Sequence, residues 1–244
     1  MTADAARSRR APLTPRRRRG VERLDEPGVD PAVRLRSLRD VARSNTLFGG
    51  RRAVLLDVER ALRECGPRAS LLDVGTGLGD VPAGARRLAR RCGTALTAVG
   101  LDVAEELARA ARTRTGAAVC GDAFRLPFAD RSVDVVTCSQ LLHHFPEAEG
   151  RLLIAELDRV ARRRVIVGDL RRSWLAAAGF WLASWPLRFH PVTRHDGVLS
   201  VLRGFTTAEL RGLVRDAVGT VPTVHRRLGW RLVASWAPAA GSGA

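Results

Sequence analysis

The sequence contains no tyrosine, no lysine and only one asparagine among its 244 residues. The lack of tyrosine excludes a tyrosine general base from any catalytic site. The four cysteines show no C-x-x-C spacing, which argues against a zinc ribbon or a disulfide framework and predicts a reducing, cytoplasmic setting. No apolar run reaches the roughly 18 residues of a membrane-spanning helix, and no apolar run of a secretory signal follows the arginine-rich N-terminus. With these classes excluded, the sequence is that of a globular protein with a hydrophobic core of ordinary size.

Positive charge dominates the composition, with 41 basic and 25 acidic residues and a net charge of +16. Such a balance can indicate binding to the phosphates of nucleic acid. Every basic residue here is arginine, however, which is typical of compositional drift in a GC-rich coding sequence. The excess of basic over acidic residues persists when residues 1–30 are left out, so we expect a basic surface. Compositional drift explains this surface better than nucleic-acid binding does.

Residues 1–29 differ from the rest of the chain. They hold the four consecutive arginines Arg16 to Arg19 and several prolines, with almost no apolar periodicity. This pattern predicts a disordered, solvated arm. A tether to anionic lipid or to RNA is the alternative.

Helical spacing of apolar residues begins after Asp30-Pro31, which is typical of a helix cap followed by proline at the first helical position. A first helix is expected over residues 31–44, and Gly49-Gly50 separates it from a second that ends near Cys65. Residues 30–66 would therefore form an N-terminal helical cap on a single domain of residues 30–244.

From residue 70 onward, short apolar runs alternate with amphipathic helical segments. This alternation predicts a parallel sheet with helices on both faces, in which ligands bind beyond the carboxyl ends of the strands. Strands are expected near residues 70–74, 95–101, 117–120, 133–138, 165–169, 221–225 and 231–234. Helices are expected near residues 81–92, 104–112 and 147–162, and after a capping box formed by Thr206 and Glu209.

Residues 173–189 hold five of the twelve aromatic side chains of the protein. Trp174, Trp181 and Trp185 fall on one face of a predicted helix. The segment is too short to span a bilayer, so it can roof an apolar acceptor pocket, pack in the core or, less readily, lie on a membrane. Residues 172–205 are thus interpreted as a tryptophan-rich cap insert.

The stretch LLDVGTGLGD follows the first expected strand and opens a helix. Gly75, Gly77 and Gly79 allow the backbone to turn tightly and approach a ligand, and the helix start behind them offers free N–H groups. The spacing differs from the G-x-G-x-x-G of dinucleotide folds. The carboxylate of Asp73 at this edge favours a ligand that carries an amine over a pyrophosphate.

Two further expected strands end in an aspartate. Asp102 can accept hydrogen bonds from ribose hydroxyls, and it can also cap the helix that starts there. Asp122, which follows Gly121, can reach an adenine amino group. These positions suit a ligand that contains adenosine.

Four motifs in this order resemble those of class I S-adenosylmethionine-dependent methyltransferases: DVGTGLGD, the strand-end Asp102, GDAFRLPF and DVVTCSQLLHHF. The similarity covers about residues 69–170 and is to the small-molecule branch that includes quinone-biosynthesis methyltransferases. The flanking segments DVARSNTLFGG and RHDGVLSVLRGFT are similar to bacterial methyltransferases encoded near type III polyketide synthases. The resemblance implies a Rossmann-like α/β fold with a seven-stranded, mainly parallel sheet, an antiparallel last strand, N-terminal helices and a helical insert after strand 5.

The resemblance also implies S-adenosyl-L-methionine as the cofactor and assigns contacts to it. Gly75, Gly77 and Gly79 would pass beneath its methionine and ribose. The other implied contacts are Asp73 with the methionine amine, Asp102 with the ribose hydroxyls, Val103, Asp122 and Ala123 with the adenine, and Ser139 and Gln140 near the sulfonium.

Methyl transfer requires alignment of nucleophile and methyl group, and an oxygen nucleophile with a pKa of about 10 gains from a nearby base. His143 and His144 follow the fourth strand, where acceptor and methyl group would meet, and Asp169 borders the same cleft. One of the histidines can be the base, or both can support the strand–helix turn. His195-Asp196, in a loop predicted for TRHDG, is a second candidate pair for the acceptor. No His/Cys/Asp spacing predicts a metal site.

The motifs typical of methyltransferases that act on nucleic-acid bases are missing after the fourth strand. We therefore expect methyl transfer to a small aromatic or lipidic acceptor, at a phenolic oxygen of a polyketide-type metabolite in secondary metabolism. Three alternatives stay open: C-methylation of a quinone precursor, RNA methylation, and a catalytically silent cofactor-binding module. Peripheral membrane contact is a further expectation, and the oligomeric state does not follow from the sequence.

Overall fold

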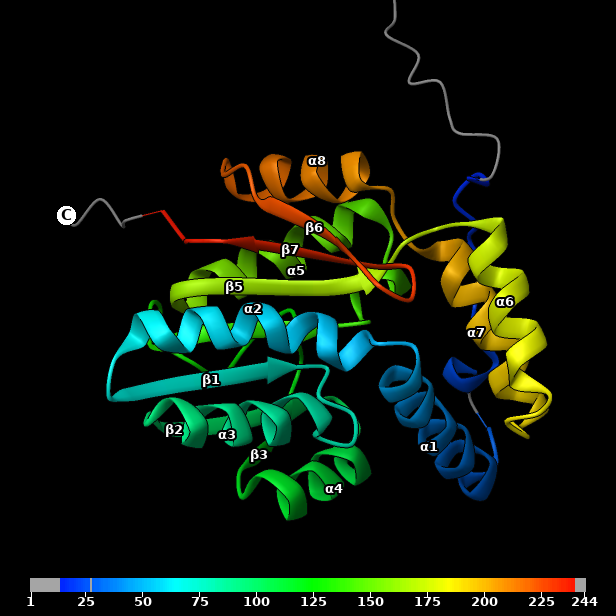
Figure 1. Ribbon diagram of the computed structural model, residues 1–244, viewed down its shortest axis with the longest axis horizontal. Coiled ribbons are helices and arrows are strands. Elements are labelled where there is room, and N and C mark those ends of the chain that lie inside the picture. The colour runs from blue at the N-terminus through cyan, green and yellow to red at the C-terminus, as the bar shows by residue number, and fades with distance from the viewer. Residues whose placement is uncertain (1–13, 27, 240–244) are drawn as a thin grey trace, which may run out of the picture.

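The computed structural model describes residues 14–26 and 28–239 (Figure 1). Within them lie seven strands: β1 (Arg68–Val74), β2 (Ala95–Asp102), β3 (Ala118–Cys120), β4 (Val133–Ser139), β5 (Ala161–Leu170), β6 (Thr223–Arg227) and β7 (Arg231–Trp236). They form one sheet in the order β3-β2-β1-β4-β5-β7-β6. Strands β1 to β5 pair in parallel, whereas β7 is antiparallel to both β5 and β6. The predicted seven-stranded, mainly parallel sheet with an antiparallel last strand is confirmed.

Eight α-helices lie in the described residues: α1 (Pro31–Leu47), α2 (Gly50–Cys65), α3 (Asp80–Cys92), α4 (Glu105–Thr115), α5 (Glu147–Val160), α6 (Trp174–Ser184), α7 (Pro191–Arg203) and α8 (Thr207–Val218). One apolar cluster joins α2 and α3 to one face of the sheet, and a second joins α5 and α8 to the other. The carboxylate of Asp30 caps α1, and the capping box of Thr206 and Glu209 begins α8. Both helix starts match the sequence prediction.

The carboxyl ends of the parallel strands meet at one edge of the sheet. The register aligns Asp73 of β1 with Gly100 of β2, and Asp102 of β2 with Cys120 of β3. Helices α1, α6 and α7 lie beyond this edge, where the arrowheads of β1 and β5 point (Figure 1). Helix α1 and the helical insert therefore lie over the end of the sheet at which a ligand is expected. Helix α2, the second helix of the predicted N-terminal cap, instead packs on a face of the sheet.

The N-terminal strap, residues 14–26, is packed against the domain. The Arg18 N–H donates to the Leu202 carbonyl at 3.1 Å, and the Arg17 side chain donates to the Arg203 carbonyl at 2.7 Å. The buried Arg172 guanidinium in turn donates to the Pro15 carbonyl at 2.8 Å. The prediction of a disordered arm is therefore wrong for these residues, because main-chain carbonyls of the cap insert supply acceptors that composition does not reveal. Residues 1–13 of the predicted arm lie outside the described residues.

The sequence TRHDG lies inside α7, so the loop predicted around His195 is wrong. The His190 imidazole accepts the Val192 N–H at the start of the helix, with proline at the first helical position. Gly197 does not mark a turn. A Cβ at Gly197 would lie 2.2 Å from the Phe180 ring, so this glycine allows α6 and α7 to pack closely.

Candidate cofactor and acceptor site

The glycine bend after β1 depends on its three glycines. Gly75, Gly77 and Gly79 have φ angles of 70°, 53° and 74°, a region that other residues adopt only with strain. The Gly75 N–H donates to the Leu101 carbonyl at 2.9 Å, which ties the bend to β2. A Cβ on Gly77 would meet no atom within 4 Å. The bend thus borders open space where a ligand can approach the backbone.

Asp102 holds the bend from the end of β2. Its Oδ2 accepts the Gly77 N–H at 2.9 Å and its Oδ1 accepts the Ala104 N–H at 3.1 Å. Burial raises the pKa of the Asp102 carboxyl, although these backbone donors oppose that rise. The residue therefore shapes the loop and begins the turn into α4. Each carboxylate oxygen retains a second lone-pair direction for a ligand hydroxyl.

Asp73 is buried at the end of β1. Its two oxygens accept the hydroxyl protons of Thr76 at 2.8 Å and Thr137 at 2.7 Å. Burial raises the pKa of Asp73 to about 7, and the nearby carboxylates of Asp102 and Asp80 add to the rise while the hydroxyls oppose it. The carboxyl group that the sequence analysis assigned to a cofactor amine is thus clamped by two threonines in this fold.

Asp73 is expected to make the stability of the unliganded protein depend on pH. A folded-state pKa above the unfolded value near 3.9 contributes stability that is full at low pH and is lost as pH rises toward 7. Asp73→Asn, which cannot ionise, should therefore gain stability relative to wild type by about 1 kcal/mol per pH unit between pH 5 and 7. Urea unfolding of both proteins across this range measures the difference. A constant difference would contradict the raised pKa.

The other predicted cofactor contacts lie along the same edge of the sheet. Asp122 accepts the Phe124 N–H at 2.9 Å and is exposed beyond β3, next to the half-buried Ala123. Val103 follows Asp102 and is 77% exposed. The final predicted contacts are Ser139, which ends β4, and Gln140, which follows it. Gln140 has a left-handed φ of 57°, and its N–H donates to the Gly168 carbonyl at 2.7 Å. Their contact with a ligand stays a prediction.

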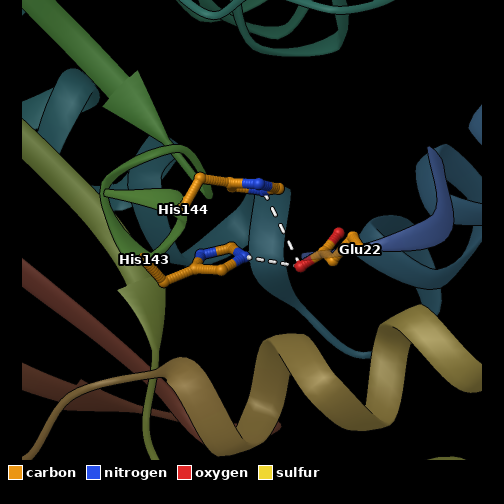
Figure 2. A group of neighbouring side chains, drawn as sticks. All are labelled: Glu22, His143 and His144. Atoms are coloured by element: carbon orange, nitrogen blue, oxygen red, sulfur yellow. Dashed lines mark ion pairs between the residues drawn. The ribbon is translucent and has the colours of Figure 1, made fainter. Parts of the chain in front are cut away.

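His143 and His144 form the short 3-10 turn η2 (Leu142–His144) after β4. His143 is fully buried, and Asp169 at the end of β5 holds it twice: Oδ1 lies 2.7 Å from Nδ1, and Oδ2 accepts the backbone N–H at 3.0 Å. Its Nε2 points toward Glu22 of the strap, with 3.7 Å between Nε2 and Oε1 (Figure 2). His144 is half-buried and turns its own Nε2 toward the same oxygen at 4.0 Å.

Glu22 is the residue of this group that the sequence analysis missed. It is 6% exposed, accepts the Ser200 hydroxyl proton at 2.6 Å, and lies 3.6 Å from the Arg203 guanidinium. An acidic residue inside an arginine-rich, proline-bearing segment gives no local signal of burial. Only the packing of the strap against α7 and η2 brings it to the histidines.

The charges of this buried group depend on one another. Burial disfavours a charged His143, but the carboxylates of Asp169 and Glu22 outweigh burial and raise the pKa of His143. Burial likewise opposes ionisation of Glu22 and Asp169, and the neighbouring imidazoles keep the pKa of each carboxyl below its usual range. A fully buried ring held between two carboxylates is poorly placed to reach an acceptor, whereas His144 has an exposed edge.

His195 lies on α7 with its Nδ1 2.8 Å from the Asp196 carboxylate. The two oxygens of Asp196 accept the backbone N–H groups of Arg23 and Leu24, both at 3.0 Å. Asp196 of the predicted pair thus anchors the strap at the two residues that follow Glu22. A direct contact between His195 and an acceptor stays a prediction.

A cavity of about 530 Å³ opens beside the two histidines. The strap, η2, α7 and α8 surround it, and its lining includes Arg17, His143, His144, Phe145, Arg203 and Phe205. Its size falls in the range typical of small-molecule sites. Leu141, which directly precedes η2, packs against the glycine bend, because a Cβ on Gly75 would lie 2.8 Å from the Leu141 side chain.

Comparisons with known proteins agree with this arrangement. Residues 72–167 match the family described as "Methyltransferase domain". The demethylmenaquinone methyltransferase of Thermotoga maritima is 32% identical over 124 residues, which are 47% of this chain and 52% of that protein. The match thus spans about half the length of that curated relative.

Among solved structures, magnesium protoporphyrin IX methyltransferase from Synechocystis PCC 6803 with bound SAH is similar, with a TM-score of 0.53 and 18% identity, over 78% of this chain and 84% of that one. A SAM-dependent methyltransferase from Aquifex aeolicus has a TM-score of 0.51 and 20% identity, over 81% of this chain and 97% of that one. At these identities the structures show the fold alone. The family match thus covers residues 72–167, and the fold and the glycine bend around it are similar to those of class I S-adenosylmethionine-dependent methyltransferases.

Proposed function

We propose that the protein transfers a methyl group from S-adenosylmethionine to a phenolic oxygen of a small aromatic or lipidic acceptor. The observation that carries the proposal is the glycine bend held by the Asp102 carboxylate, together with the cavity lined by the two histidines of η2, the turn that follows Leu141. One end of the arrangement suits an adenosyl group and the other a small acceptor.

The residues present fit this cofactor. Open space over Gly77 leaves room for the methionine and ribose, Asp102 has lone pairs for ribose hydroxyls, and the buried Asp73 provides a carboxylate for an ammonium group. When bound, the cofactor supplies an electrophilic methyl group on a sulfonium. The protein then has to align the acceptor and exclude water, which the strap and the cap insert do by covering the edge of the sheet.

The acceptor side of the proposal rests on His144. Its side chain is 24% exposed, and it lines the cavity beside Phe145 and Phe205. An acceptor hydroxyl with a pKa of about 10 must lose its proton to become a good nucleophile. We propose that the exposed edge of His144 takes part in that activation, while His143 positions η2 through Asp169.

Incubation of the full chain with S-adenosylmethionine labelled in its methyl group and a panel of phenols and quinone precursors tests the proposal. An O-methyl ether, identified by its NMR shift, is the expected product. A ring-methylated product would favour C-methylation, the reaction class suggested by the name of the T. maritima relative. Tight cofactor binding without turnover on any acceptor would contradict an enzymatic role.

We further propose peripheral contact with an anionic membrane through the outer face of α6. Trp174, Leu175, Trp181, Leu182 and Trp185 are between 45% and 62% exposed there. Arginines lie next to these side chains. Arg18 stacks over Trp174 and Arg194 stacks over Trp185. Just after α6, Arg36 and Arg43 donate hydrogen bonds to the carbonyls of Arg188 and Leu187, respectively. Apolar aromatic side chains within a basic rim suit an interface of anionic lipids. No helix in the described ranges has the length and apolarity needed to cross a bilayer.

Flotation with phosphatidylglycerol vesicles is the measurement for this contact. The wild-type protein should float with the vesicles, and Trp181→Ala together with Trp185→Ala should reduce the bound fraction at least about fivefold, because each buried aromatic contributes on the order of 1–3 kcal/mol. Leu228→Ala, which removes an 89% exposed side chain outside α6, is the matched control. Equal binding by all three proteins would contradict the proposal.

A further inference from the structure

We propose that Glu22, His143 and His144 bind one divalent transition-metal ion, with Zn²⁺ as the reference ion. This site goes beyond methyl transfer, and its test requires neither cofactor nor acceptor. No spacing in the sequence predicted it, because Glu22 is far from the histidines along the chain. The strap brings the carboxylate over η2, so that the donor atoms of the three residues all lie within 4.8 Å of one another.

The distances suit a site that closes slightly around an ion. Glu22 Oε1 lies 3.7 Å from His143 Nε2 and 4.0 Å from His144 Nε2. Ligand atoms at the usual zinc distances of about 2.0–2.2 Å are roughly 3–3.5 Å apart in tetrahedral geometry. A movement of about half an ångström by the Glu22 side chain brings its oxygen to that spacing from both imidazole nitrogens. Figure 2 shows both imidazoles turned toward this one oxygen.

A second observation, independent of the distances, indicates that His143 is a metal ligand. It is 3% exposed, and its Nε2 is buried without a hydrogen-bond partner in the part of the chain that the structure describes. Buried polar nitrogens in proteins nearly always have a partner. Its Nδ1 lies 2.7 Å from the Asp169 carboxylate, and a proton on Nδ1 would leave the Nε2 lone pair directed at Glu22. This carboxylate–histidine arrangement is the usual support of a metal-binding imidazole.

The chemistry of the donors selects the ion. Two imidazole nitrogens and one carboxylate oxygen suit zinc and its first-row neighbours better than magnesium or calcium, which prefer oxygen ligands alone.

Access and coordination number point to an open site. His143 and His144 both line the 530 Å³ cavity, which provides an entry path for an ion. Three protein ligands leave a fourth position for water or for an oxygen of a molecule in the cavity, as in catalytic rather than structural zinc sites. A hydroxyl bound at that position would be acidified by the ion.

Metal titration of the untagged full chain, stripped with a chelator and free of cofactor, tests the site. We expect one equivalent of Zn²⁺ to bind by calorimetry, and Co²⁺ to give the visible absorption of a tetrahedral centre with nitrogen and oxygen ligands. Glu22→Gln, which retains an acceptor for Ser200, and His144→Ala should each weaken binding at least tenfold and abolish the Co²⁺ spectrum. Asp169→Asn should weaken Zn²⁺ binding about 10- to 100-fold.

His225→Ala, on β6, is the matched control and should bind as wild type does. Thermal melts of each metal-free variant show whether it is folded, so that a loss of binding is not mistaken for unfolding. Absence of stoichiometric Zn²⁺ binding by the folded wild-type chain would overturn the proposal. Binding unchanged in both Glu22→Gln and His144→Ala would overturn it equally.

Discussion

His144→Ala is expected to lower turnover by about 10²–10⁴-fold, the usual contribution of a group that activates a nucleophile. The affinity for S-adenosylmethionine should stay within about threefold, because the residue lies at the cavity rather than at the glycine bend. Methyl-label transfer to the acceptor measures turnover, and calorimetry measures the dissociation constant of the cofactor. The split between the two quantities separates activation of the acceptor from a structural role.

A variant of a histidine outside the site gives the comparison. His225→Ala should turn over at the wild-type rate. If His144→Ala also did so, the residue would be removed from the reaction. If it lost cofactor affinity and turnover equally, the histidine pair would instead support the turn beneath the cofactor, the structural alternative that the sequence allows.

Asp102→Ala is expected to weaken cofactor binding by about 1.5–3 kcal/mol, which is about a 10- to 150-fold rise in the dissociation constant. Two losses contribute. The ribose hydroxyls lose a charged acceptor, and the Gly77 N–H loses the oxygen at 2.9 Å that holds the bend in shape. Calorimetric titration with S-adenosylmethionine or S-adenosylhomocysteine gives the value directly.

Glu105→Ala is the matched control for Asp102→Ala. This acidic residue lies at the start of α4, is exposed and pairs with Arg109, so its loss should leave cofactor binding unchanged. Asp102→Asn, which retains one acceptor oxygen, should fall between wild type and alanine. Wild-type affinity in Asp102→Ala would show that the carboxylate serves only to shape the loop.

Local sequence determined the cofactor half of this site. A buried strand, a run of glycines and an aspartate at the next strand end each follow from short-range rules, since backbone freedom and alternation of strand and helix are properties of neighbouring residues. Gly75, Gly77 and Gly79 form the expected tight turn with left-handed φ angles, and Asp102 reaches the bend from the adjacent strand.

The acceptor half was decided by tertiary structure. TRHDG lies within α7, and Gly197 leaves room there for the Phe180 ring of α6. From the sequence alone, a glycine needed for helix packing looks the same as a glycine in a loop. The strap is ordered because carbonyls and carboxylates of the cap insert bind it, and Glu22 meets His143 only through that docking. The periodicity of neighbouring residues is enough to predict the helices, the strands and the edge of the sheet at which the parallel strands end. The position of Glu22 cannot be predicted in this way, because the strap reaches the histidines only through contacts with residues far away in the sequence.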